Sequence, residues 1–385
     1  MELLDLFNKK YGDIRVEGLD SKYLPFLKLK SYLDEYFPDK VSLGKSFLGN
    51  EIYELKIGSG KTKILAWSQM HGNESTGTRA ILDVFEFLKL NENWSKFILE
   101  SISFHFIPML NPDGSTLFTR RNAAGIDLNR DFLQEASPEI RLLKSYVQKH
   151  QPYFLFNLHD QRTIFNVGNT AKPATLSFLA PSADDNRLET ESRIQSMAVI
   201  DYMVKGLEKI IPGCLARFSD EFYPTSTGDN FMKMGFPCIL FEAGHYPHDY
   251  QRDHVRKYNA LSILLALEKI CSHDLSDKGN YDQIPQNNKK FLDIILRNVL
   301  VRSNDSESLL DIGIYLDERL DLDSQEILFC SRIEEIGDLS NYFGHIDIDK
   351  KGKIYVGKSS MFPIIGDLAD FSVGTIHFET GKFNG

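Results

Sequence analysis

The sequence predicts an α/β fold followed by a small β-rich domain. Apolar runs of strand length alternate with longer segments whose apolar residues recur at helical spacing. The expected strands are 63–70, 102–109, 153–158 and 236–241. The expected helices are 76–90, 137–150, 188–211 and 252–273. Residues 161–185 are rich in Gly, Pro, Asn and Ser and are expected to form loops. After residue 312, short apolar runs alternate with Gly-containing turns, which favours β structure there.

The ends of the chain differ from this central pattern. Residues 1–40 carry short helical patterns without a chemical motif, and we expect an N-terminal helical extension. Residues 41–47 and 51–57 flank Leu-Gly-Asn, a turn sequence that favours a hairpin. The principal domain is expected over residues 41–275. Residues 276–385 are expected to form a polar linker, a short helix at 290–301 and the β-rich domain.

Composition limits the possible functions. A chain of 385 residues is long enough for about two domains. The formal net charge of -10 argues against nucleic acid or an anionic membrane as the main partner. Four widely spaced cysteines indicate reduced thiols. The acidic start lacks a signal-peptide pattern and no apolar run reaches membrane-spanning length, so we expect a cytoplasmic protein.

A candidate metal site begins where the first central strand ends. His71 and Glu74 are three positions apart directly after the apolar run 63–70. Imidazole and carboxylate are zinc ligands, and a catalytic zinc commonly has three protein ligands and a water. His159 ends another apolar run, and strand ends in α/β sheets share one binding edge. The sequence therefore predicts one zinc ion bound by His71, Glu74 and His159.

Two further carboxylates follow buried strands. Glu242 ends the run 236–241, and an unpaired buried carboxylate is costly, so we expect it to face a polar site. Beside a metal it could be the general base for an attacking water, while a salt-bridged structural acid is the alternative. Asp160 could orient a neighbouring ligand. His105, inside a strand, is expected to be structural.

A loop rich in arginine lies between these strands. Residues 119–131 include Arg120, Arg121 and Arg130 and show no helix or strand periodicity. A solvated polar loop is one interpretation. Guanidinium groups bind carboxylates through paired hydrogen bonds, so near a metal these arginines also suggest an anionic group on the substrate.

Five motifs together resemble a known family. They occur in the order found in zinc metallocarboxypeptidases of the carboxypeptidase A type, over roughly residues 41–273. The motifs are His71-Gly-Asn-Glu74, Asn111-Pro-Asp-Gly114, Arg120-x4-Gly125-Ile-Asp-Leu-Asn129-Arg130, the strand-end His159 and the strand-end Glu242.

The resemblance implies a mixed central sheet with helices on both faces, and it implies a role for each matching residue. His71, Glu74 and His159 would bind zinc, and Glu242 would be the base and proton shuttle. Arg120 would polarise the scissile carbonyl and stabilise the oxyanion. The pair that clamps the substrate carboxylate would be Asn129 and Arg130. Tyr223 resembles the tyrosine that caps the substrate, and Arg162 could add a second anion contact.

These roles predict a zinc-dependent hydrolase that cleaves a C-terminal amino acid from a peptide by metal-activated water. The substrate would be a peptide or acyl amino acid with a free carboxylate. His159-Asp-Gln-Arg162 and Glu242-Ala-Gly are also similar to the aspartoacylase and succinylglutamate desuccinylase branch of the same fold, which likewise carries a β-rich C-terminal domain. An N-acyl amino acid deacylase is therefore the first alternative, and an inactive ligand-binding protein is the second.

Overall fold

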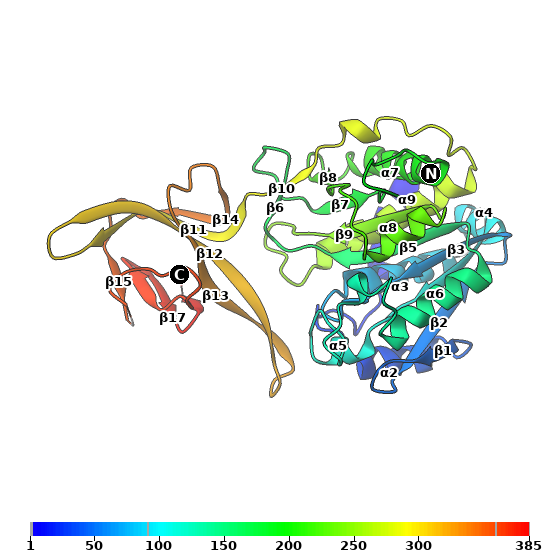
Figure 1. Ribbon diagram of the computed structural model, residues 1–385, viewed down its shortest axis with the longest axis horizontal. Helices are drawn as coiled ribbons and strands as arrows, with labels where there is room; N and C mark the ends of the chain where they lie inside the picture. The colour runs from blue at the N-terminus through cyan, green and yellow to red at the C-terminus, as the bar shows by residue number, and fades with distance from the viewer. Residues whose placement is uncertain (1–2, 91, 359, 385) are drawn as a thin grey trace. The chain divides into compact units, whose positions relative to one another are not determined.

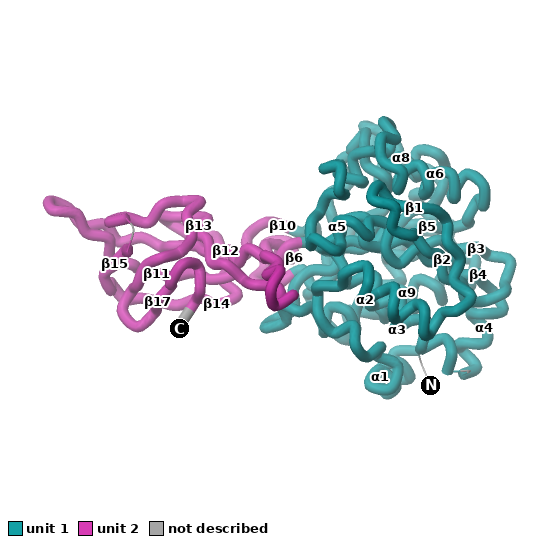
Figure 2. Tube along the Cα trace, turned by 90° about the horizontal axis from the view of Figure 1, so that it is seen from below, with its two compact units in different colours: residues 1–161, 174–287 teal, residues 162–173, 288–385 magenta. Residues whose placement is uncertain are grey.

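A computed structural model describes residues 3–90, 92–358 and 360–384 (Figure 1). The chain divides into two compact units (Figure 2). Unit 1 comprises residues 1–161 and 174–287, and unit 2 comprises residues 162–173 and 288–385. The short segment 162–173 thus leaves unit 1 for unit 2, and the chain then returns to complete the unit 1 sheet.

The helices of the described chain all belong to unit 1. Helix α6 begins with a side-chain cap: Ser137 accepts a hydrogen bond from the Ile140 amide, with Pro138 in the first turn. No described helix combines the length and apolar character needed to cross a lipid bilayer. The helices are α1 (Leu3–Ile14), α2 (Phe26–Tyr36), α3 (Thr76–Lys89), α4 (Asn93–Ser101), α5 (Pro112–Thr116), α6 (Pro138–His150), α7 (Glu191–Leu207), α8 (Thr227–Lys233) and α9 (Asp253–Cys271), with 3-10 turns η1 (Leu128–Arg130) and η2 (Tyr281–Gln283).

An eight-stranded sheet forms the centre of unit 1, with strand order β1-β2-β4-β3-β5-β9-β7-β8. The inner strands β4, β3, β5 and β9 are parallel, whereas β1 pairs antiparallel with β2 and β2 with β4. β7 pairs antiparallel with β9 and parallel with β8. The strands are β1 (Val41–Lys45), β2 (Glu51–Ile57), β3 (Thr62–Trp67), β4 (Ile102–Ile107), β5 (Phe154–Asp160), β7 (Leu176–Leu179), β8 (Leu215–Arg217) and β9 (Cys238–Ala243).

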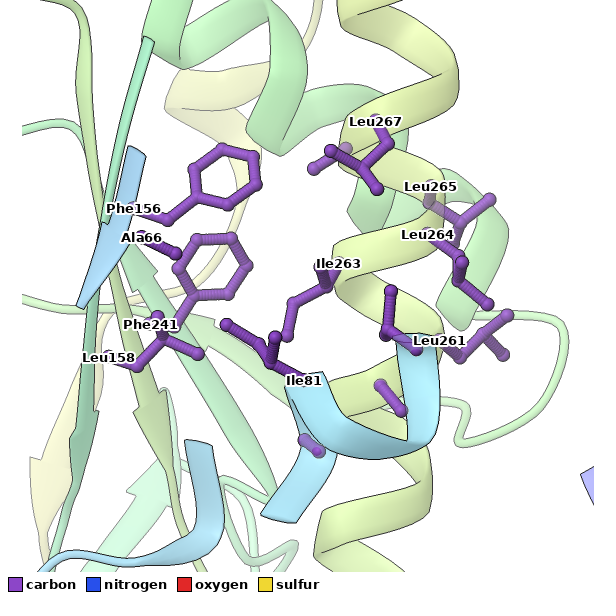
Figure 3. Close-up of a cluster of buried hydrophobic side chains, with 14 of the residues drawn as sticks. Ala66, Ile81, Phe156, Leu158, Phe241, Leu261, Ile263, Leu264, Leu265 and Leu267 are labelled. Atoms are coloured by element: carbon purple, nitrogen blue, oxygen red, sulfur yellow. The ribbon is translucent and has the colours of Figure 1, made fainter. Parts of the chain in front are cut away.

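Buried side chains cover both faces of this sheet. On one face, Phe156 and Phe241 lie edge to face, with ring centroids 5.1 Å apart, and point toward Ile81 of α3 and Ile263 of α9 (Figure 3). On the other face, Trp67 packs with residues of α6 and α8. Burying each large apolar side chain stabilises the fold by about 1.5–3 kcal/mol. The predicted mixed sheet with helices on both faces is confirmed.

The N-terminal segment is tied to this core by a buried ion pair. Arg256 of α9 donates to both carboxylate oxygens of Asp83 in α3, at 2.7 and 2.5 Å. Asp83 also accepts from the Val16 amide at 2.8 Å and from the Tyr11 hydroxyl at 3.1 Å. Arg256 donates in addition to the Leu19 carbonyl. Three separate parts of the chain therefore share one set of buried polar contacts.

Unit 2 is built from strands. One four-stranded sheet has the order β13-β12-β11-β14, another the order β15-β16-β17-β18, and β6 pairs with β10. Apolar residues from both four-stranded sheets form one core. The strands are β6 (Phe165–Val167), β10 (Asn287–Lys289), β11 (Phe291–Arg302), β12 (Glu307–Asp321), β13 (Glu326–Gly337), β14 (Phe343–Asp349), β15 (Tyr355–Gly357), β16 (Phe371–Val373), β17 (Ile376–Glu379) and β18 (Lys382–Asn384).

Two expectations about secondary structure are wrong. Residues 290–301, expected as a short helix, form strand β11, because this long apolar run pairs with β12 on one side and β14 on the other. Residues 161–185, expected as loops, contain β6 and β7. The run of β7 is only four residues long, too short to show a period, and its strand character comes from its place between β9 and β8.

Replacing Asp83 by alanine should destabilise unit 1 by about 3–5 kcal/mol, because Arg256 would remain buried without its partner. Trp67 and Trp94 are the only tryptophans and both belong to unit 1, so tryptophan fluorescence during urea unfolding measures this unit. The control Glu86→Ala, which removes a partly exposed pair with Lys89 on the same helix, should cost at most about 1 kcal/mol. Equal losses in the two variants would contradict the role of the buried pair.

Candidate metal centre

The candidate site lies where three neighbouring parallel strands end. Strands β3, β5 and β9 are adjacent in the sheet and run in the same direction. His159 and Glu242 are register partners at the ends of β5 and β9, and His71 follows the end of β3. The strand ends that the sequence marks with polar residues therefore meet at one edge of the sheet.

His71, Glu74 and His159 form a compact buried cluster. Their ligand atoms all lie within 4.8 Å of one another. The Nδ1 atoms of the two histidines are 3.1 Å apart, and each lies 2.8 Å from a different oxygen of Glu74. Two imidazole nitrogens and a carboxylate are the donor set of zinc hydrolases. The residues present therefore fit a zinc ion.

Electrostatics in the cluster favour a charged Glu74. Burial by itself raises the pKa of this carboxyl, but His71 and the hydrogen bonds with His159 and His71 hold the pKa well below its usual value. Burial lowers the pKa of His159, which favours the neutral imidazole that binds metals. An ionised carboxylate between imidazoles is the state in which this cluster can receive a cation.

Glu242 stands beside the cluster in a different electrostatic situation. Its side chain is half-buried. Burial raises the pKa of Glu242 well above its usual value, and the neighbouring Glu74 and Asp160 raise it further. A carboxyl group with a raised pKa can accept a proton near neutral pH more readily than an ordinary glutamate. A cation bound at the cluster would oppose this rise, because positive charge favours the ionised carboxylate.

Arg120 lies at the exposed rim of the cluster. Its Nη1 is 3.1 Å from His71 Nδ1 and donates to Glu74 at 3.3 Å, while Nε donates to Asp127 at 2.9 Å. The guanidinium therefore lies directly beside the candidate ligands. A fixed positive charge at this point can stabilise negative charge that develops on a substrate.

A second group of predicted substrate-binding residues consists of Asn129, Arg130 and Tyr223. The Asn129 side chain accepts a hydrogen bond from the Thr227 amide at 3.0 Å, which joins η1 to α8. Arg130 is exposed and lies over the ring of Tyr223, 4.1 Å from its centroid. The fold thus brings Tyr223, which is far away in the sequence, beside the neighbouring residues Asn129 and Arg130.

Comparison with known proteins identifies the family that this sequence resembles. Residues 30–206 match the model of the zinc carboxypeptidase family. Probable carboxypeptidase 2 of Trichophyton verrucosum is 31% identical over 113 residues, which is 29% of this chain and 21% of that protein. The predicted resemblance to zinc carboxypeptidases is confirmed. Human carboxypeptidase D is 24% identical over 213 residues, 44% of this chain and 15% of that protein. The chain thus spans about a fifth or less of the length of these relatives.

Solved structures share the fold of this carboxypeptidase-like unit. Carboxypeptidase A from Helicoverpa armigera has a TM-score of 0.55 and 15% identity, with 70% of this chain and 81% of that chain covered. Thrombin activatable fibrinolysis inhibitor has a TM-score of 0.51 and 18% identity, with coverage of 71% and 80%. At these identities the similarity shows the fold alone.

One residue of the carboxypeptidase-like site was missed by the sequence analysis. Asp127 Oδ1 lies 3.2 Å from His71 Nε2, and Oδ2 accepts from Arg120. Burial favours the protonated form, yet the hydrogen bonds and charges of His71 and Arg120 hold the pKa of Asp127 far below its usual value. The residue stands within the motif around Asn129, but only the fold shows that it contacts both His71 and Arg120.

Asp160 and Arg162 differ in their relation to the cluster. The Asp160 amide donates to Glu74 at 3.2 Å, and its carboxylate accepts from Thr76 at 2.7 Å, so the residue contacts a candidate ligand through its backbone. Arg162 belongs to unit 2, where its guanidinium lies 4.9 Å from the ring centroid of Tyr315. Its predicted contact with substrate stays a prediction.

Asp127→Asn should weaken zinc binding about 10- to 100-fold, because the amide cannot fix the ring of His71 as the carboxylate does. Competition with a chelator followed by elemental analysis measures this affinity. His159→Ala should lose the metal altogether, whereas the exposed Asp185→Asn should bind zinc like the parent protein. Full zinc occupancy in His159→Ala would refute the assignment of the ligands.

Proposed function

We propose that this chain is a zinc-dependent carboxypeptidase-type hydrolase that releases a C-terminal amino acid from peptides. The supporting observation is that one sheet edge combines three groups: a His-Glu-His cluster, a carboxylate with a raised pKa and exposed arginine side chains. The first group suits a metal, the second suits proton transfer and the third suits a carboxylate on the substrate.

In the proposed reaction each residue has a separate task. A zinc ion bound by His71, Glu74 and His159 would supply Lewis acidity for the amide carbonyl and for the attacking water. Glu242 accepts the proton of that water at its carboxylate and passes it to the leaving amine, which restores the base. Arg120 stabilises the negative charge that develops on the carbonyl oxygen.

Asn129 and Arg130 would orient the substrate through its terminal carboxylate. Arg130 presents an exposed guanidinium, while Asn129 is fixed through its bond to α8. Tyr223, held against the Arg130 guanidinium, would cover the bound residue. A fixed substrate end places the last peptide bond in one position, which explains a preference for single C-terminal residues.

Product identification separates this proposal from its alternatives. The zinc-loaded protein is mixed with a peptide library and a set of N-acyl amino acids, and the products are identified by mass spectrometry. Release of single C-terminal residues supports the carboxypeptidase activity. Cleavage of acyl amino acids alone would instead assign the chain to deacylation, and zinc binding without any cleavage would favour a ligand-binding protein.

Glu242→Gln should reduce turnover by about 10²- to 10⁴-fold while leaving zinc bound, because the amide cannot accept the proton. The readouts are the initial rate on the best peptide and the zinc content of the same sample. Glu35→Gln, at an exposed position of α2, is the matched control and should behave like the parent protein. A Glu242→Gln variant that keeps its rate would rule out this residue as the base.

Arg130→Ala should raise KM about 10- to 100-fold for peptides with a free terminus, which corresponds to losing one charged hydrogen-bond contact. The preference for a free over an amidated terminus should disappear. Arg121→Ala is the control, since Arg121 is exposed in the same loop and donates to the Gly125 carbonyl. If the parent protein cleaves both kinds of peptide equally well, no carboxylate clamp exists.

A further inference from the structure

A second concave region of unit 1 lies away from the metal cluster, beside the hairpin β1–β2 and helix α6. It consists of two depressions that share Tyr146 and His150. The first, here called the Tyr146 cavity, has a volume of about 460 Å³. The second, here called the basic groove, has a volume of about 430 Å³. None of the residues assigned to the metal site lines either depression.

The Tyr146 cavity has an apolar wall and a fully bonded polar floor. Phe37, Val41 and Ile57, which are partly or fully exposed, supply apolar surface. On the floor, Glu54 accepts hydrogen bonds from Tyr146 and from His105, whose other ring nitrogen lies 2.8 Å from Ser103. Although burial opposes it, these bonds hold the pKa of Glu54 below its usual value. Of the two acids that line the cavity, Glu54 is therefore already paired within the protein, and Asp39 is exposed.

Cations surround the two depressions in a chain whose formal net charge is -10. Lys40, Lys56 and Lys89 line the Tyr146 cavity, and Lys45, Arg141 and Lys149 line the basic groove. Among the described residues that line the groove there is no acidic side chain. Within the described parts of the chain, Lys56 and Lys149 have no ion-pair partner.

The local field at the shared wall is positive. His150 stacks on Tyr146, with ring centroids 4.3 Å apart. Burial lowers the pKa of His150, and the charges of Lys63 and Lys149 lower it further. A neutral, stacked imidazole next to lysines leaves their charge available to an incoming anion. The helix dipole favours a cation at the end of α6, where Lys149 lies. Lys56 lies on a strand, where no helix dipole favours a positive charge.

We propose that the Tyr146 cavity and the basic groove together bind a small amphipathic anion, an organic carboxylate or phosphate with an aliphatic or aromatic body. The apolar body lies against Phe37, Val41 and Ile57. The anionic group contacts Lys56 at the cavity and the cations of the groove. The volumes of the two depressions are typical of small-molecule sites, which combine apolar walls with a few fixed polar groups. The site is separate from the proposed hydrolase activity.

The test uses the full-length zinc-loaded protein and four probes with the same chain: octanoate, octyl phosphate, octanol and octylammonium. Isothermal titration calorimetry should show saturable binding of the carboxylate or the phosphate, and the comparison between these two identifies the preferred head group. Octanol and octylammonium should bind at least about tenfold more weakly, because they lack the negative charge that the lysines attract.

Charge-reversal variants locate the site. Lys56→Glu and Lys149→Glu should each weaken octanoate binding about tenfold or more, while Lys209→Glu, an exposed lysine outside both depressions, should bind like the parent protein. The octanoate binding that Lys56→Glu and Lys149→Glu weaken should persist in Arg130→Ala, because Arg130 lines neither depression. Any octanoate bound at the proposed carboxylate clamp would be lost in Arg130→Ala alone. Loss of all octanoate binding in Arg130→Ala, equal binding of octanol, or unchanged binding in both Lys56→Glu and Lys149→Glu would each overturn the proposal.

Discussion

The position of one carboxylate determines the whole candidate site. Glu74 has a histidine nitrogen 2.8 Å from each of its oxygens, and the Asp160 amide donates to it from the end of β5. It therefore links the turn after β3 to the end of β5, immediately before α3 begins at Thr76. Without this carboxylate, the Nδ1 atoms of the two imidazoles would lie buried 3.1 Å apart with no acceptor between them. The arrangement of the ligands and their electrostatics thus depend on the same side chain.

Four carboxyl groups lie close together around this point. Glu74, Asp127, Asp160 and Glu242 all lie near the strand ends, and mutual repulsion contributes to the raised pKa values of Asp160 and Glu242. Arg252 is a buried cation that donates to the Gln161 carbonyl at 2.6 Å and to the Ala243 carbonyl, directly after the two strand-end acids. It lowers the pKa of both acids but forms no direct pair with either, so much of the repulsion remains. A divalent ion at the cluster is the natural complement to these carboxyl groups.

The sequence alone predicts the role of a residue when that role depends only on its neighbours along the chain. Strands β3, β5 and β9 could be predicted because each is a continuous apolar run that stops at a polar residue, and parallel strand ends must share an edge. Asp127 could not, since its role requires His71, more than fifty residues away, to lie beside it. β11 is a mostly apolar segment of twelve residues whose apolar positions fit a helix or a strand, and only pairing with β12 and β14 decides between them. Arg162 lies just beyond Gln161, where the chain passes from unit 1 to unit 2, a boundary without a compositional signal.

Net charge is a poor guide to which ligands this surface attracts. The formal charge of -10 disfavours polyanions, because a large partner experiences the whole protein. A small anion experiences only the charges within about 8 Å, the screening length at physiological salt. Within that distance, Arg120 and Arg130 present exposed cations in one region of unit 1, and the lysines of β1, β2 and α6 present them in another. An acidic protein can therefore select small carboxylates at two separate places, provided that its own acids near each place are already paired, as Glu54 is with His105 and Asp127 is with Arg120.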